Sequence, residues 1–312
     1  MSVHAHETSQ MSKHDFAWVP HYENDPWPYK LVWPIMEAMV WWVLFKKLIL
    51  HRKLAVHNLF FDGLATECRK IREGAARWPA MDIIYNFRKK QLGWNPFKWP
   101  GIILDNFWIH MRNAQAVRNR FKRTRYDLER SCYLLKNLGR PIRILSLACG
   151  SAQAVAETVA LLSTEGYQFE VLLIDYEEGA LKKASEIAEK YRIGDCFTYK
   201  RGVVQRFPKY LDGFKPDIVE MVGFFDYLND KQAVEVVELV HEMLPQKGTF
   251  ITCHIHPNPE QDFLTNVIGW DSNMLYRSVD EFANLVDSGG FDKVQVVIEP
   301  LGIHSVLVAT KT

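Results

Sequence analysis

Residues 142–153, IRILSLACGSAQ, decide the fold of this 312-residue chain. An apolar run leads directly into a turn of small residues, and a helical pattern begins at Gln153. Small residues at such a turn let the backbone approach a ligand closely, and the N-terminus of the next helix supplies donors for a negative group. The turn alone also suits tight strand-to-helix packing, so its meaning depends on the rest of the sequence.

From this stretch to the C-terminus, strand-like and helical patterns alternate. The strand-like runs are 142–148, 169–175, 217–223, 248–255, 294–300 and 304–310, with a further strand ending near Gly202; the helical stretches are 153–163, 177–191, 229–243 and 278–288. This alternation predicts an α/β fold with a Rossmann-like, mostly parallel seven-stranded sheet covered on both faces. The three-residue link 301–303 requires a hairpin, which makes the final strand antiparallel.

The predicted second strand ends at Asp175, which lies 25 residues after Gly150. An acid at this position is placed to accept hydrogen bonds from ribose hydroxyls. Together with the small-residue turn, it predicts an adenosine-containing ligand at the carboxyl edge of the sheet. The turn lacks the GxGxxG pattern, which argues against NAD.

The succession LSLACGSA (145–152), LLIDYEEGALKKA (172–184), DIVEMVGFFDYL (217–228) and MLPQKGTFITCHI (243–255), followed by the final hairpin, resembles class I S-adenosylmethionine-dependent methyltransferases. The resemblance covers roughly residues 141–312 and implies S-adenosyl-L-methionine as cofactor. By position, the implied cofactor residues are Ala148, Cys149, Gly150, Ser151 and Gln153 near the methionine part, Asp175 at the ribose, Tyr176, Val203 and Val204 at the adenine, and Gly223 and Phe224 beside the methionyl group. The family often has an acid near the end of strand one, where this chain has Ser146.

A narrower resemblance lies in 224–230 and 254–282, which are similar to bacterial methyltransferases related to the enzyme that makes 3-hydroxypalmitate methyl ester. It points to fatty or other carboxylic acids as substrates. A carboxylate needs no base, whereas a hydroxyl or an amine usually does.

The candidate catalytic residues follow the fourth and fifth predicted strands. His254 and His256 are the candidate bases. Asp226 is expected to point toward the same cleft, at the carboxyl ends of the strands. Tyr276 with Arg277 is a candidate site for an anionic group. Each has a structural alternative: the histidines would cap the sheet edge or bind a loop, and Arg277 would pair with Asp280 or Glu281.

The chain divides by composition into three parts. Residues 1–25 are predicted to be a mobile polar tail, 26–138 a Trp-rich helical region that covers the substrate, and 139–312 the cofactor-binding domain. Nine of the ten tryptophans lie at or before Trp108. Residues 1–140 carry 23 Lys and Arg against 12 Asp and Glu, and the remainder carries 15 against 25. Two segments with different surroundings are therefore expected.

Within the N-terminal half, three features have alternative interpretations. The apolar segment 31–50 has no clean run long enough to span a bilayer, so a lid helix is expected, with peripheral membrane contact as the alternative and a true span as a third reading. A long helix is expected over 102–137, with a kinked helix as the alternative to a straight one. The basic stretch 118–125 is interpreted as a solvated face or a docking surface, and no nucleic-acid partner is predicted.

Five scattered cysteines form no disulfide framework and no metal-binding pattern, and no signal peptide pattern is visible, so a cytoplasmic location is predicted, or a membrane-peripheral one if 31–50 contacts lipid. The expected activity is methyl transfer to a carboxylate or hydroxyl of a small, partly apolar molecule. The alternatives are N-methylation of a small amine, or a non-catalytic cofactor-binding or membrane-associated protein. The sequence does not define the oligomeric state.

Overall fold

A computed structural model describes residues 20–24, 29–49, 64–74, 77–88, 90–268, 273–291 and 293–312. Residues 1–19 of the predicted tail lie outside the described residues. Within the described part, one sheet has the strand order β3-β2-β1-β4-β5-β7-β6. Its strands are β1 (Ile142–Leu147), β2 (Phe169–Asp175), β3 (Phe197–Arg201), β4 (Ile218–Met221), β5 (Thr249–Ile255), β6 (Lys293–Ile298) and β7 (His304–Thr310). β7 is antiparallel to both of its neighbours, and β1 to β5 pair in parallel, so the predicted fold is confirmed.

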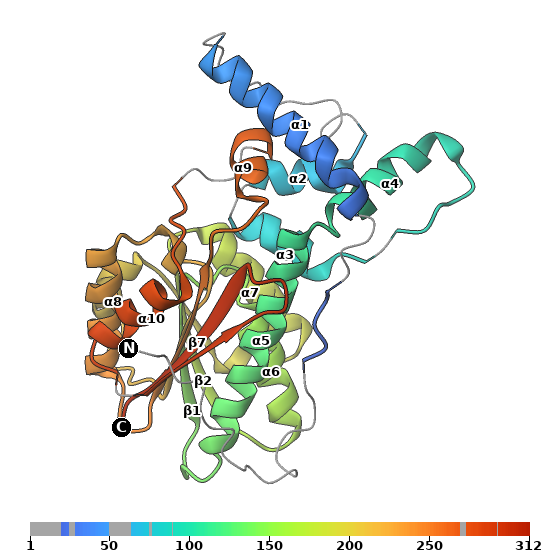
Figure 1. The fold of residues 1–312 in the computed structure, drawn as a ribbon. Coiled ribbons are helices and arrows are strands. Elements are labelled where there is room, and N and C mark those ends of the chain that lie inside the picture. The colour runs from blue at the N-terminus through green and yellow to red at the C-terminus, as the bar shows by residue number, and fades with distance from the viewer. Residues whose placement is uncertain are drawn as a thin grey trace.

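Helices lie on both faces of the sheet, as Figure 1 shows. One face carries α5 (Arg112–Leu134), α6 (Gln153–Thr164) and α7 (Glu178–Lys190), and the other carries α8 (Asp230–Met243) and α10 (Val279–Ser288). Four of the six residues of β1 are apolar because the strand faces both layers: Ile144 packs toward α6, and Leu145 and Leu147 pack toward α8. Capping boxes at Asn229 and Ser278 begin α8 and α10.

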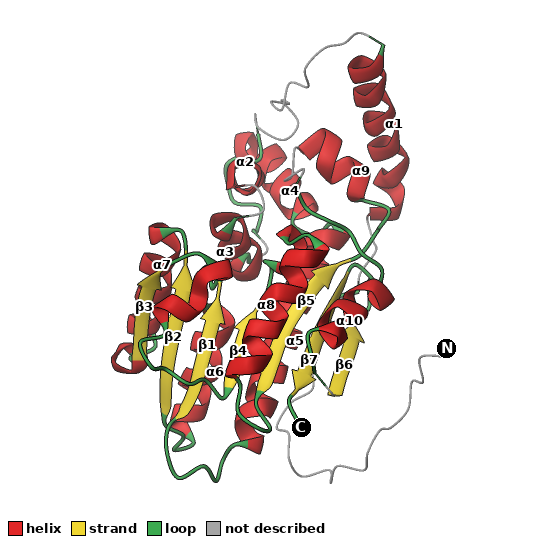
Figure 2. Cartoon of the chain, turned by 90° about the vertical axis from the view of Figure 1, so that its left-hand side faces the viewer, coloured by secondary structure: helices red, strands yellow, loops and turns green. Residues whose placement is uncertain are grey.

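The remaining helices lie above the carboxyl ends of the strands (Figure 2). They are α1 (Tyr29–Leu48), α2 (Thr66–Gly74), α3 (Trp78–Asn86), α4 (Trp99–Trp108) and the short α9 (Gln261–Phe263). A separate apolar cluster joins α1, α2, α4 and α9 and includes Met36, Cys68, Trp108 and Phe263, whereas Ile84 of α3 packs with Ile109 and Val117. A helical cover over the carboxyl edge of the sheet is therefore present.

The predicted helix over 102–137 is wrong as a single helix, because the chain turns between α4 and α5. Met111 is extended at the N-cap of α5, with ψ of 153°. The carboxylate of Glu260 accepts hydrogen bonds from the backbone N–H groups of Arg112 (3.1 Å) and Asn113 (2.9 Å). A carboxylate from a distant loop thus satisfies the free donors that begin a new helix.

The second of these helices, α5, lies within the predicted cover region but packs on the sheet. Leu128 and Cys132 are fully buried in the same core as α6. The predicted boundary at residue 139 therefore separates α5 from the layer that it completes, and the cover consists of the helices before residue 112.

The basic stretch 118–125 on α5 is not simply a solvated face. Arg118 and Lys122 contact Glu23, Arg123 pairs with Asp127 at 2.7 Å, and Arg125 pairs with Glu129 and Glu157 at 2.9 Å. The fifth cation, Arg120, is only 4% exposed.

The apolar segment predicted over 31–50 forms most of α1. One side packs into the cover through Met36, whereas Trp41, Trp42, Phe45 and Leu48 are exposed. Among the described helices, none combines the length and the apolar character needed to cross a membrane.

Candidate active site

A cavity of about 660 Å³ lies between the carboxyl edge of the sheet and the helical cover. Such a volume is typical of sites for small molecules and cofactors. The eleven residues predicted to bind the cofactor all line this cavity: Ala148, Cys149, Gly150, Ser151, Gln153, Asp175, Tyr176, Val203, Val204, Gly223 and Phe224. The structure therefore brings together residues that are spread over four strand ends.

The turn after β1 has an unusual backbone. Ala148, Gly150 and Ala152 have φ of 48°, 53° and 48°, in the left-handed region. Non-glycine residues adopt this region only where their surroundings hold them there, often at functional sites. The turn therefore has the constrained shape expected of a ligand-binding loop.

Asp175 holds this turn in place from the end of β2. One carboxylate oxygen accepts a hydrogen bond from the Gly150 N–H, and the other from the Glu177 N–H, both at 2.8 Å. Burial raises the pKa of the Asp175 carboxyl, although the backbone donors act in the opposite direction. Two such donors leave other lone pairs of the carboxylate for a ligand.

The other predicted cofactor residues differ in exposure. The side chains of Tyr176 and Val203 are 65% and 39% exposed, as expected for walls of an open site. Val204 also packs into the core below the sheet, so it contributes only part of its surface. Gly223 has φ of 90°, a conformation that favours glycine, and Phe224 follows it.

A buried carboxyl that the sequence did not reveal lies beneath the turn. Glu220 on β4 is the register partner of Ser146 on β1. Its side chain accepts hydrogen bonds from the Ser146 hydroxyl and from the Val222 N–H at 3.1 Å. Burial raises the pKa of Glu220 to about 7. The acid that the family often has on strand one is thus supplied by the adjacent strand.

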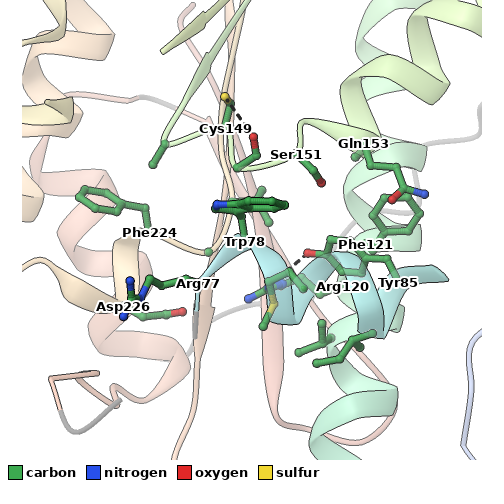
Figure 3. Close-up of a pocket in the computed structure, with 18 of the residues that line it drawn as sticks. Arg77, Trp78, Tyr85, Arg120, Phe121, Cys149, Ser151, Gln153, Phe224 and Asp226 are labelled. Carbon is green, nitrogen blue, oxygen red and sulfur yellow. Dashed lines mark hydrogen bonds between the residues drawn. The ribbon is translucent and has the colours of Figure 1, made fainter. Parts of the chain in front are cut away.

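Helix α3 lies over the turn and closes the cavity above it (Figure 3). A Cβ on Gly150 would lie 3.5 Å from Cβ of Trp78, and one on Gly179 would lie 3.3 Å from its indole. The side-chain amides of Asn86 and Gln153 exchange hydrogen bonds at 2.9 and 3.0 Å. These contacts join the cover directly to the cofactor side of the cavity.

Among the predicted catalytic residues, Asp226 lines the cavity and His254 does not. His254 is fully buried between Phe225 and Phe282, with Nδ1 2.7 Å from Asp226 Oδ1. The Ile255 N–H also donates to Asp226 Oδ1, at 2.9 Å. Burial tends to raise the pKa of Asp226, but the contact with His254, together with smaller contributions from His304 and Arg120, holds the pKa below its usual value.

The other three candidates also lie outside the cavity lining. Nδ1 of His256 donates to the Arg277 carbonyl, and Nε2 is hydrogen-bonded to the Ser305 hydroxyl, each at 2.8 Å. Arg277 is buried and pairs with Asp230 at 2.8 Å, not with Asp280 or Glu281. Tyr276 packs on the cluster of Ile255 and Leu301. The expectation that His254, His256, Tyr276 and Arg277 face the cavity is therefore wrong. Their side chains instead pack in the core or contact the segment between β5 and α10.

Part of the cavity lining combines apolar and polar groups that the sequence did not single out as a site. Its apolar lining includes Ile84, Ile109, Met111, Val117, Leu264 and Met274. Two buried polar side chains, Arg120 from α5 and His304 from β7, also line it. His304 begins the last strand, and only its pairing with Ile255 brings it to this edge.

Three solved structures have a similar fold. A protein from Bordetella parapertussis described as a "possible exported protein" has a TM-score of 0.64 and 16% identity, covering 91% of this chain and 98% of its own. The CMeT domain of the citrinin polyketide synthase has a TM-score of 0.53 and 15% identity, and the match covers 80% of this chain and 66% of that one. Magnesium protoporphyrin IX methyltransferase from Synechocystis PCC 6803, with bound SAH, has a TM-score of 0.50 and 12% identity. The match covers 74% of this chain and 92% of that one.

The sheet order and the strand-edge cavity are those that the sequence predicted, and the fold is shared with a methyltransferase whose structure holds SAH. Residues 53–311 match a family described as "Putative methyltransferase". This match spans most of the chain, so the protein belongs to that methyltransferase family. A search of curated proteins found no match.

Proposed function

We propose that this protein transfers a methyl group from S-adenosyl-L-methionine to an oxygen of a small, partly apolar acceptor, a carboxylate or a hydroxyl. One observation carries the proposal: the constrained turn and Asp175 share a single cavity with an apolar chamber lined by the cover. When bound, the cofactor supplies a methyl group on a sulfonium.

The residues at the strand edge fit a cofactor of this kind. The left-handed turn at Gly150 lines the cavity with its backbone, and Trp78 of α3 lies against it. Asp175 would bind ribose hydroxyls, and Tyr176, Val203 and Val204 would flank the adenine. Glu220, beneath the turn, is suited to the cationic amino group of the cofactor, because a positive charge favours the ionised carboxylate.

Transfer from a sulfonium needs alignment and exclusion of water more than it needs a strong acid or base. Trp78 and α3 exclude water from the turn, and the Asn86–Gln153 pair holds them there. Asp226 has a lowered pKa and is therefore a weak base. This favours an acceptor that is already ionised, such as a carboxylate.

We also propose that α1 contacts an anionic membrane surface. Trp41 and Trp42 are 73% and 56% exposed beside Phe45, and the ammonium of Lys46 lies 4.7 Å from the Trp42 ring centroid. Exposed aromatic side chains next to lysines are typical of helices that lie at the headgroup level of a bilayer. An acceptor with an apolar part would be concentrated at such a surface.

The activity is tested by incubating the full-length protein with S-adenosylmethionine and a panel of alkanoic acids, phenylalkanoic acids and matching alcohols. We expect a methyl ester or methyl ether, identified by mass spectrometry, together with S-adenosylhomocysteine in equal amount. Calorimetry in parallel measures cofactor binding. Absence of cofactor binding by the folded protein would refute the proposal.

A further inference from the structure

Arg120 is a buried cation that forms no ion pair with a carboxylate within the described part of the chain. Its side chain lines the cavity from α5, and its Nε atom has no hydrogen-bond partner there. The contacts of its Nη2 atom are weak, with the Tyr85 hydroxyl at 3.4 Å and the Met81 sulfur at 3.7 Å. A buried charge without a partner is costly, so such a group in a cavity indicates a missing counter-ion.

The same helix shows what an ordinary arginine does in this protein. Arg118, Arg123 and Arg125, also on α5, each bond to a carboxylate at 2.9 Å or less. Asp226 and Glu220 are close enough to interact electrostatically with Arg120, but no ion pair joins Arg120 to either carboxyl among the described residues. Oδ1 of Asp226 is instead bonded to the Ile255 N–H and lies against His254.

A second unpartnered polar side chain lines the cavity beside Arg120. His304 is 2% exposed, and neither ring nitrogen has a hydrogen-bond partner among the described residues. Burial first, and then the charge of Arg120, hold the pKa of His304 well below its usual value. The neutral ring therefore retains one N–H donor for a ligand.

We propose that Arg120 and His304 form a binding site for the carboxylate of the acceptor. The inference rests on the proposed function and narrows its acceptor to an apolar carboxylic acid. The guanidinium and the ring N–H would bind the carboxylate, and Ile84, Val117 and Met274 would surround the apolar part. A Cβ on Gly223 would lie 3.5 Å from Arg120 Nη2, so this site adjoins the predicted methionyl side of the cavity.

In the reaction that follows, one carboxylate oxygen forms a bond to the methyl carbon. The bond between that carbon and sulfur breaks, and its electron pair stays on sulfur. The products are a methyl ester and a neutral thioether, and no proton is transferred. The ester has lost the charge that Arg120 binds, which weakens the hold on the product.

The test compares binding of matched acids and alcohols to the full-length protein in the presence of S-adenosylhomocysteine. The probes are hexanoate, dodecanoate, hexadecanoate and 4-phenylbutyrate, each with the alcohol of equal length. We expect the wild type to prefer at least one acid over its alcohol by roughly 10- to 100-fold, the range for hydrogen bonds to a charged group. Arg120→Gln should abolish that preference, and His304→Phe should reduce it.

Two controls keep the result interpretable. Arg130→Gln removes a cation from the same helix outside the cavity and should leave the preference unchanged. Arg120→Lys retains the charge and should retain part of the preference for acids. It therefore provides the test if Arg120→Gln fails to fold. Equal binding of acids and alcohols by the wild type, or an unchanged preference in a folded Arg120→Gln variant, would overturn the proposal. Binding of S-adenosylhomocysteine, measured separately, reports on the proposed function.

Discussion

Glu220→Gln should change the pH dependence of stability. Burial raises the pKa of Glu220 from its usual 4.5 to about 7 in the folded protein. A carboxyl whose folded pKa lies above its unfolded pKa contributes full stability below the unfolded value, and loses it as pH rises through the folded value. In the wild type, stability should therefore decrease from the acidic range toward neutral pH and above.

The expected size follows from the two pKa values. Between about pH 5 and about pH 8, ionisation of Glu220 in the unfolded chain should lower the free energy of unfolding by about 2.5 kcal/mol. Glutamine does not titrate, so the variant should gain about 2.5 kcal/mol relative to the wild type over the same interval. Any altered hydrogen bond to Ser146 or Val222 adds a constant offset, which cancels when the two pH values are compared.

Urea unfolding of both proteins without cofactor, at several pH values across this range, measures the difference directly. Glu235→Gln on the surface of α8 is the matched control, because this glutamate is 56% exposed. Parallel pH profiles for the wild type and Glu220→Gln would show that Glu220 titrates normally, and would refute the argument from burial.

Three further predictions concern the cavity and the cover. Asp175→Ala should weaken S-adenosylmethionine binding by about 1.5–3 kcal/mol, the range for hydrogen bonds to a charged group; equal affinities by calorimetry would remove Asp175 from the site. Trp78→Ala should raise the KM for the cofactor with little effect on the melting temperature, and a KM within twofold of wild type, as a rough threshold, would contradict the covering role of α3. Replacing Trp41 and Trp42 with Ala should lower affinity for vesicles of phosphatidylserine and phosphatidylcholine by roughly tenfold or more. Vesicle affinity unchanged in that double variant, or a dimer of the wild type that dissociates in it, would refute membrane contact.

The sequence predicted the sheet and the cofactor edge because local patterns encode both. Every predicted cofactor residue lies at a strand end or in the segment that follows it, and the ends of neighbouring parallel strands meet at one edge whatever lies above them. The alternation of strands and helices was therefore enough to place Gly150, Asp175 and Gly223 around one cavity.

The acceptor side was poorly predicted because packing between distant segments forms it. His254 and His256 are two residues apart, so they lie on the same side of the strand, as expected. Phe225, Phe282 and Ser305 nevertheless surround them and keep them out of the cavity. Arg120 looked like one charge among five in 118–125. Only the helix orientation distinguishes it from its neighbours, and no local pattern encodes that orientation.

The close fit of α3 on the β1 turn has a kinetic consequence. A spent cofactor held beneath Trp78 has to leave before a fresh one enters, so the α3 contact must loosen in each catalytic cycle. The Asn86–Gln153 amide pair and the Lys183–Asp82 ion pair, at 3.1 Å, would then act as a latch. The rate at which these two contacts break would then limit the turnover number, although neither contact involves a reacting atom.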